Sequence, residues 1–478
     1  MTRIHLAFVT ALGSVLLSGV GPLSPFLQAQ PPGVPAKQAL VERLGQDQAV
    51  RARLAERRLL AADRGSEVVP GRLAVKFSPE LEEATVTALA ARHRAERRPR
   101  PAFADFDIVT IDADADPHAA AAALAREPGV LYAEPIGIAR AHYRPNDPLL
   151  QYQWNLAQLE LERTWEINPG ASSAIVVAVL DEGVAYRNFG NDYQQAPDLA
   201  GTTFVTGYDF IWDDDVPIDF GGHGTHVSGT VAQSTNNNLG VAGIAFNASV
   251  MPVKVLASDF DFEMGAPNVP TLALVAQGVR FAAENGAKVI NMSLGSRTPS
   301  TPLRDAIQFA VDRGAVVVIS AGNSGDAGSP TEYPAAYAKD INGVIAVAAT
   351  EYSRTRAPYS NVNDYVELAA PGGDVDKDLN GDGFVDGVLQ QTIDIDEVFV
   401  TGRFDQFGYF FFEGTSMAAP HVAALAALLM DQGVTNPAAV EAALKRFATD
   451  LGPTGRDNEY GHGLINPRAT LRGLGLAR

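Results

Sequence analysis

Short apolar segments alternate with helical segments over the C-terminal two thirds of this 478-residue chain, and this alternation restricts the fold more than any other feature. Continuous apolar runs of strand length are typical of strands buried on both faces, as in a parallel sheet covered by helices. The predicted strands are 250–256, 288–294, 315–320 and 344–349, and the predicted helices are 272–284, 303–313 and 437–447. The sequence therefore predicts an α/β domain with helices on both faces of a parallel sheet.

A candidate acid follows a further strand-like segment near the start of this domain. The apolar run 174–180 ends in Asp181, and Gly183 opens the next loop. Ligand and reaction sites of open α/β sheets lie at the carboxyl ends of the strands, where Asp181 is predicted to lie. The alternative is an ordinary strand-end aspartate that caps a turn.

A candidate base lies in the segment 221–232, Gly-Gly-His-Gly-Thr-His-Val-Ser-Gly-Thr-Val-Ala. Glycines on both sides of His223 permit a sharp turn, and the small residues after it predict a tightly packed helix that begins near His223. The alternatives are a surface or core histidine, or a metal site with His226. No third ligand follows at the spacing of a zinc motif, which disfavours a catalytic zinc.

A candidate nucleophile lies near the C-terminal end, where Gly414-Thr415-Ser416 runs into the apolar stretch 422–430. This places Ser416 at the start of a helix, where free backbone N–H groups favour a developing negative charge. Short Gly-Thr-Ser runs are also common turns and helix caps. Ala418 replaces the glycine of the nucleophile-elbow pattern, so the hypothesis depends on the acid and the base.

Asp, His and Ser in this chain order form one of the known arrangements of a catalytic triad on an α/β scaffold. His-Gly-Thr-His-Val-x-Gly-Thr around His223 and Gly-Thr-Ser-Met-Ala-x-Pro-His around Ser416 make the chain resemble the subtilisin family (subtilases) of serine proteases, over about 147–467. One departure is Glu182, where the family usually has Ser or Thr. A second carboxylate beside Asp181 is expected to raise the pKa of the pair or to shift the pH optimum.

The resemblance implies a role for each matching residue. Ser416 attacks the scissile carbonyl, His223 takes and returns the proton, and Asp181 holds the imidazole. Asn323, which follows the predicted strand 315–320, donates to the oxyanion together with the backbone N–H of Ser416. No catalytic metal is expected.

The resemblance also implies where a protein or peptide substrate binds. Ser293, Leu294 and Gly295 match the family strand that pairs with the substrate and lines the pocket for the residue before the cut. Glu332 falls near the floor of that pocket, where a carboxylate would favour Lys or Arg. The alternative for Glu332 is a surface-loop carboxylate.

The N-terminal part of the chain predicts a secreted precursor. Residues 1–29 have the basic start, apolar stretch and small-residue cleavage site of a signal peptide. Residues 30–143 resemble a subtilase propeptide, with a ferredoxin-like α+β domain from about residue 68, which would act as chaperone and intramolecular inhibitor. Strands are expected at 71–77, 107–111 and 130–135, helical bias at 36–64 and 80–100, and cleavage between Ile138 and Asn146. An unrelated accessory domain is the alternative.

Charge is unevenly distributed between these regions. Residues 1–143 hold 17 Lys+Arg and 16 Asp+Glu, whereas the catalytic domain predicted at 144–478 holds 20 and 40. Such acidity disfavours partners that are nucleic acids or anionic membranes. No segment after the signal is long and apolar enough for a membrane anchor, and a monomer is expected.

The chain has no cysteine, so disulfides and thiol chemistry are excluded and structural calcium is expected instead. In an acidic insertion at about 373–400, one set of residues matches the opening of a calcium loop: Asp378, Asn380, Asp382, Gly383 and Asp386. Leu389 stands where an EF-hand has its closing Glu, so Asp394, Asp396 or Glu397 would have to close the loop. A solvated acidic loop is the alternative. The resemblance suggests a weaker calcium site at Asp198 and Asn237.

These observations together predict a secreted serine endopeptidase that acts through Asp181, His223 and Ser416 and matures by self-cleavage. Three other classes remain open. One is a catalytically silent subtilase-fold binding module, and another is an acidic calcium-binding surface protein with fortuitous motifs. A sedolisin-type acid peptidase is the third, although His223 in its Gly-Thr-His setting is the wrong base for that chemistry.

Overall fold

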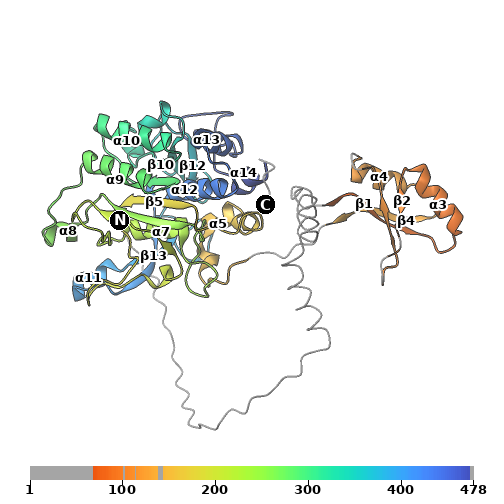
Figure 1. Cartoon of the computed structure of the whole chain (residues 1–478), viewed down its shortest axis with the longest axis horizontal. Coiled ribbons are helices and arrows are strands. Elements are labelled where there is room, and N and C mark those ends of the chain that lie inside the picture. Colours follow the sequence, from red (N-terminus) through yellow and green to blue (C-terminus); the bar gives the residue numbers. More distant parts are fainter. Residues whose placement is uncertain (1–67, 99, 101–102, 113–114, 138–143, 474–478) are drawn as a thin grey trace, which may run out of the picture. The chain divides into compact units, whose positions relative to one another are not determined.

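The computed structural model describes residues 68–98, 100, 103–112, 115–137 and 144–473 (Figure 1). The chain divides into two compact units, a small one within Leu54–His142 and a large one that begins at Tyr143. The predicted signal peptide 1–29, the helical bias at 36–64 and most of the predicted cleavage segment lie outside the described residues. No helix within the described part is long and apolar enough to cross a membrane.

The small unit is a four-stranded antiparallel sheet with two helices. Its elements in chain order are β1 (Val68–Phe77), α3 (Glu83–Arg92), β2 (Glu96–Arg97), β3 (Asp107–Thr110), α4 (Pro117–Leu124) and β4 (Val130–Gly137). The sheet order is β2-β3-β1-β4, which confirms the ferredoxin-like prediction. The segment 80–100 is not wholly helical, because α3 ends at Arg92, Arg94 adopts a positive φ of 51°, and β2 follows.

The large unit is built on a parallel sheet, as predicted. Its strands are β5 (Val176–Asp181), β6 (Thr203–Phe204), β7 (Tyr208–Asp209), β8 (Ser249–Lys254), β9 (Val289–Met292), β10 (Val316–Ser320), β11 (Val344–Thr350) and β12 (Leu368–Pro371). The order is β12-β11-β10-β9-β5-β8-β6, with β7 also paired to β8. The strand order reverses at β5, so the carboxyl ends of β5 and β9 border the crevice in which such folds bind ligands.

Helices and short turns connect and cover the strands. The helices are α5 (Trp154–Gln158), α6 (Leu161–Trp165), α7 (His223–Ala232), α8 (Asp259–Glu263), α9 (Leu272–Glu284), α10 (Thr301–Asp312), α11 (Ile395–Thr401), α12 (Thr415–Asp431), α13 (Pro437–Arg446) and α14 (Pro467–Gly473). Single 3₁₀ turns lie at Leu150–Tyr152, Pro197–Leu199, Gly325–Ala327 and Ala335–Lys339. The helices predicted at 272–284, 303–313 and 437–447 are therefore present.

Successive residues of each strand enter two separate cores, because side chains of a strand alternate between its faces. In β5, Val177 and Val179 pack with α7 and α12, whereas Ala178 and Leu180 pack with α9 and α10. Figure 1 shows these two helix pairs on opposite faces of the sheet. Burial on both faces explains why the strands read as continuous apolar runs.

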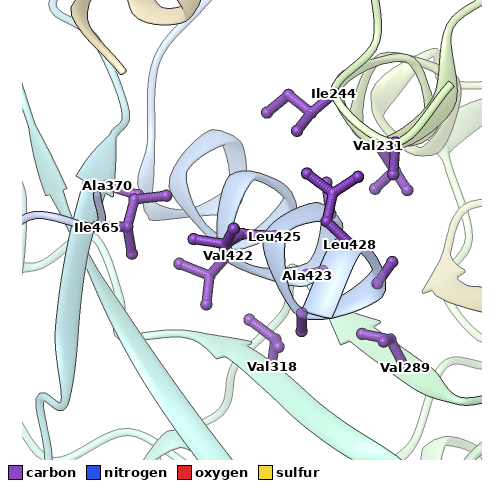
Figure 2. Close-up of a cluster of buried hydrophobic side chains, with 14 of the residues drawn as sticks. Val231, Ile244, Val289, Val318, Ala370, Val422, Ala423, Leu425, Leu428 and Ile465 are labelled. Carbon is purple, nitrogen blue, oxygen red and sulfur yellow. The ribbon is translucent and has the colours of Figure 1, made fainter. Parts of the chain in front are cut away.

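Helix α12, which begins one residue before Ser416, is the centre of the larger core. All of its residues except Ser416 are buried. Figure 2 shows Val422 and Leu425 of this helix close to Val318 of β10, with Val289 of β9 nearby. Burial of this kind stabilises by about 25 cal/mol for each Å² of apolar surface removed from water. The start of α12 is therefore held rigidly against the sheet.

The predicted acidic insertion forms two distinct structures. The acidic loop 374–386 is closed by an isolated bridge between Asp374 and Asp386. It is followed by a hairpin of β13 (Val388–Ile393) and β14 (Phe407–Phe412), with α11 between the strands. The hairpin packs on α7, where the ring of Phe412 stacks on His226 at 4.3 Å.

Candidate active site

Asp181 and His223 form a direct pair at the carboxyl edge of the sheet. Asp181 is the last residue of β5, and His223 is the first residue of α7. Their Oδ1 and Nδ1 atoms are 2.7 Å apart, with the Asp181 side chain fully buried. Burial opposes the charged imidazole, but the carboxylates of Asp181, Glu182 and Asp219 outweigh it and raise the pKa of His223 to about 9.

Asp219 holds the loop that precedes His223 in place. The sequence patterns did not indicate this role of Asp219. Its fully buried carboxylate accepts hydrogen bonds from the backbone N–H groups of Gly221, Gly222 and Thr225, and from the Thr225 hydroxyl. These bonds satisfy donors at the start of α7, which have no partners inside the helix. An aspartate four residues before a helix-starting histidine was the available signal.

Ser416 lies on the same cleft as His223. This cleft of about 450 Å³ is lined by both residues and by Asn323 and Glu182. The Ser416 hydroxyl lies 3.4 Å from the carbonyl oxygen of Ser293, and the Ser293 hydroxyl donates to the Ser416 carbonyl at 2.8 Å. Ser293 therefore ties the end of β9 to the first turn of α12.

Asn323 and the backbone of Ser416 present two donors to one small space. The side-chain oxygen of Asn323 accepts from the Thr415 N–H at 2.9 Å and from the Thr415 hydroxyl at 2.7 Å, so its amide nitrogen is the free donor. A Cβ added to Gly414 would lie 3.2 Å from that nitrogen and 3.6 Å from the Ser416 nitrogen. Gly414 has a φ of 145°, so glycine keeps both the backbone and the space available.

Glu182 is a half-buried carboxyl group on the wall of this cleft. Burial, together with repulsion from Asp219, raises its pKa to about 7. A Cβ added to Gly221 would lie 2.2 Å from Glu182 Oε2, so the glycine makes room for the carboxyl group. The structure thus gives Glu182 a raised pKa, while its effect on the pH optimum stays a prediction.

The predicted substrate residues gather at the ends of β9 and β10. Ser293, Leu294 and Gly295 follow β9 directly. A Cβ added to Gly295 would lie 2.6 Å from Glu332 Oε2, and one added to Gly322 would lie 2.7 Å from the Glu332 carboxyl carbon. Glu332 therefore lies half-buried between the two strand ends rather than on an outlying surface loop.

Most predicted ligands of the calcium loop bond to the loop's own backbone. The Asp378 carboxylate accepts hydrogen bonds from the N–H groups of Gly381 and Gly383. The Asn380 side-chain oxygen accepts one from the Asp382 N–H, and the Asp382 carboxylate accepts one from the Phe384 N–H. Asp386 differs, because it is fully buried and its Oδ1 has no hydrogen-bond partner, while its Oδ2 accepts from Leu379. Asp394, Asp396 and Glu397 belong to the start of α11, beyond β13.

The second predicted calcium site already has internal partners. Asp198 accepts from the Asn237 side chain at 2.7 Å and from the Val241 N–H at 3.0 Å, and the Tyr409 hydroxyl lies 3.3 Å from it. Burial raises the pKa of Asp198 to about 7. Within the part of the chain that the structure describes, no group of three or more His, Cys, Asp or Glu residues is arranged to hold a metal ion.

The histidine three residues after the candidate base packs inside the fold. His226 is fully buried, and its Nε2 lies 3.0 Å from the carbonyl oxygen of Val388 and 3.2 Å from that of Phe410. Burial lowers the pKa of His226 to about 3, so the ring stays neutral. These contacts orient the His226 ring toward the hairpin β13–β14. His226 is therefore not available as a second zinc ligand beside His223.

Comparisons with known proteins agree with this arrangement. Residues 172–463 match the subtilase family (Peptidase_S8), and residues 55–135 match the fervidolysin N-terminal prodomain. The chain is 32% identical to a thermophilic serine proteinase of Bacillus sp. (strain AK1), over 71% of this chain and 72% of that protein. It is 33% identical to thermitase of Thermoactinomyces vulgaris, over 66% of this chain and 94% of that protein.

Two solved structures extend the comparison to three dimensions. A protease from Pseudoalteromonas arctica has a TM-score of 0.56 and 30% identity, covering 69% of this chain and 99% of that one. Fervidolysin from Fervidobacterium pennivorans has a TM-score of 0.54 and 26% identity, covering 85% of this chain and 62% of that one. The predicted subtilisin-like fold is confirmed, and the chain belongs to the subtilase family of serine endopeptidases, with a fervidolysin-like prodomain at its N-terminal side.

Proposed function

We propose that this chain is a secreted endopeptidase that cleaves peptide bonds through an acyl-enzyme on Ser416. The observation that carries the proposal is the 2.7 Å contact between Asp181 and His223 on the cleft that Ser416 and Asn323 also line. The nucleophile, the base, the acid that orients the base and the oxyanion donor come from four segments far apart in the sequence, and this convergence is what acyl transfer requires.

In each half of the proposed reaction, His223 acts first as a base and then as an acid. The Ser416 hydroxyl turns from the Ser293 carbonyl toward His223, which takes its proton as Ser416 attacks the scissile carbonyl. His223 then gives that proton to the leaving amine. In the second half, His223 takes a proton from water, the hydroxide attacks the ester, and the proton returns to Ser416. Asp181 keeps the imidazole oriented and stabilises its charged form.

The space beside Gly414 is where the oxyanion would form. The Asn323 amide nitrogen and the Ser416 N–H both border this space. Donors that are already oriented stabilise the developing charge without reorganising during the reaction. This interaction is made in the tetrahedral intermediate, so it raises kcat rather than substrate affinity.

Glu332 supports a preference for Lys or Arg before the cut. A substrate strand paired to Ser293–Gly295 would place that side chain between the ends of β9 and β10, where Glu332 lies. Peptides that differ only in having Arg, Phe or Leu before the cut test this. The expected result is faster cleavage after Arg, lost in Glu332→Gln; equal rates for Arg and Phe in the wild type would contradict it.

The N-terminal prodomain supports a self-maturing secreted precursor. Residues 1–29 would direct secretion, and the propeptide 30–143 would inhibit the catalytic domain until cleavage between 138 and 146. The match to a fervidolysin prodomain at 55–135 supports this division. The mature enzyme would be a monomer without a membrane anchor, with protein or peptide substrates and no nucleic-acid partner.

Structural calcium is the proposed cofactor, and the acidic loop 374–386 is the better site. A buried carboxylate oxygen without a partner, Asp386 Oδ1, fits a cation, and Asp378, Asn380 and Asp382 would supply further oxygens. The ion would supply only structural order. The start of the loop contacts the segment before Ser416, because the Val375 N–H donates at 2.7 Å to Glu413, which lies three residues before Ser416. Asp198 and Asn237 are a weaker proposal, since they already bond to each other.

One experiment tests activity and maturation together. The wild type and Ser416→Ala are compared for casein hydrolysis and for intact mass of the secreted protein. The expected result is hydrolysis and a shortened chain for the wild type, and an uncut precursor for the variant. A serine-directed fluorophosphonate that fails to label Ser416 in folded, processed wild type would favour the silent binding module instead.

A further inference from the structure

An aromatic pair forms the wall of the cleft on the side of α8 and α11. Phe260 lies in α8 and Phe399 lies in α11, and their ring centroids are 4.9 Å apart. Both residues line the cleft that contains His223 and Ser416. Helix α11 connects the two strands of the hairpin β13–β14, so this hairpin forms part of the wall of the cleft.

Phe399 is exposed although the helix that carries it is well anchored. Ile395 and Val398 of α11 are buried in a cluster with Phe404, and Phe260 packs on that cluster. The Phe399 side chain, in contrast, is 67% exposed. The fold therefore does not need Phe399 for anchoring, while an aromatic ring buries 150–250 Å² when a partner covers it.

The position of Phe399 on the cleft indicates that a bound substrate would contact its ring. Any peptide cut by Ser416 has to lie along the cleft that Phe399 lines, with the scissile carbonyl between Ser416 and Asn323. A side chain close to the cut would then contact the two rings. Glu182, Asp259 and Glu413 line the same cleft, so an acidic substrate side chain is disfavoured there.

We propose that Phe399 and Phe260 form an apolar subsite that selects an aromatic or large aliphatic substrate side chain near the scissile bond. This inference rests on the proposed function, and it concerns a position other than the one assigned to Glu332. A hydrophobic contact of this kind discriminates between substrates by about 10–200-fold in kcat/KM. The specificity would thus depend on α11, the helix that connects β13 and β14.

Val400 provides a matched control on the same helix. It is the next residue of α11 and is more exposed than Phe399, at 79%, but it does not line the cleft. If exposed apolar surface on α11 affected the enzyme only through solubility or stability, Phe399→Ala and Val400→Ala would have similar effects. If the cleft contact matters, only Phe399→Ala changes which peptides are cleaved.

The test uses mature enzyme and a series of fluorogenic peptides. All peptides have the same residue directly before the cut, and each of the other positions near the cut is varied in turn. The wild type is expected to cleave peptides with Phe, Leu or Met at one such position at least about 10-fold faster, in kcat/KM, than peptides with Ala or Asp. Phe399→Ala is expected to lose most of this ratio, mainly through KM, and Phe399→Leu to keep part of it. Val400→Ala is expected to match the wild type.

Three results would overturn the inference. One is an unchanged ratio in Phe399→Ala that has the thermal midpoint of the wild type. Another is an equal loss in Val400→Ala. The third is a wild-type preference for Lys or Arg at that position, which would show that Asp259 and cation–π contact with the rings select the side chain instead of apolar burial. Failure of the proposed function is a separate outcome, because wild-type Ser416 would then not react with a fluorophosphonate.

Discussion

The side-chain oxygen of Asn323 accepts two hydrogen bonds from Thr415, the residue directly before Ser416. One comes from the backbone N–H at 2.9 Å and the other from the hydroxyl at 2.7 Å. An amide whose oxygen is held in this way has its nitrogen fixed on the opposite side. The start of α12 therefore both carries the proposed nucleophile and orients the side chain that would stabilise the oxyanion.

Removal of this donor should reduce turnover. Asn323→Ala is expected to lower kcat by about 10²–10³-fold, or about 2.7–4 kcal/mol, the range known for an oxyanion asparagine of a subtilisin, with KM little changed. Steady-state kinetics on one peptide substrate checks this. Thr415→Ser, which keeps the hydroxyl, is the control and should resemble the wild type. A variant with raised KM and unchanged kcat would place Asn323 in substrate binding only.

Neutralising Glu182 should shift the pH dependence of activity. Its carboxylate helps raise the pKa of His223 to about 9, and the base acts only when neutral, so wild-type kcat/KM is expected to rise with pH toward that value. Glu182→Gln removes a raising influence, so the acid limb should move to lower pH. Asp259→Asn is the control, because Asp259 is exposed on the same cleft. An acid limb that stays fixed or moves upward contradicts the prediction.

Calcium removal should destabilise the protein through Asp386. EDTA is expected to lower the thermal midpoint of Ser416→Ala protein, and Asp386→Asn should greatly reduce that shift. A calcium concentration a hundred times its Kd stabilises by about 2.7 kcal/mol. Asp376→Asn is the matched control, since this exposed neighbour is not a proposed ligand. A midpoint that is the same in EDTA and in calcium would exclude structural calcium.

Truncation of the central helix should be costly. Leu425 of α12 is fully buried, so Leu425→Ala is expected to lower the free energy of unfolding by about 2–5 kcal/mol through lost burial and a cavity. Denaturant unfolding in the Ser416→Ala background measures this without self-digestion. Leu239→Ala, at a side chain that is 40% exposed, should change stability by about 0.5 kcal/mol or less. Similar losses at both positions would contradict the described core.

Local patterns predicted the parallel sheet, the ferredoxin-like unit and the placement of Asp181 and His223. Each rests on short-range physics: continuous apolar runs for strands buried on both faces, and glycines with small residues around His223. The oxyanion role of Asn323 was predicted from the family resemblance, because the residues around Asn323 by themselves indicate only a turn. The two-residue strand β2 was missed, because so short an edge strand has no periodicity to detect.

Contacts between distant segments decided the rest. The sequence by itself determined which residues are candidates for the chemistry and at which ends of which elements they lie, because helix and strand patterns and family motifs are local. Only the tertiary structure decided that Asp219 holds the loop before His223, that Asp386 has a buried oxygen without a partner, and that Phe399 of α11 borders the cleft. Burial and hydrogen-bond partners are properties of packed surfaces, and packing joins residues more than a hundred positions apart.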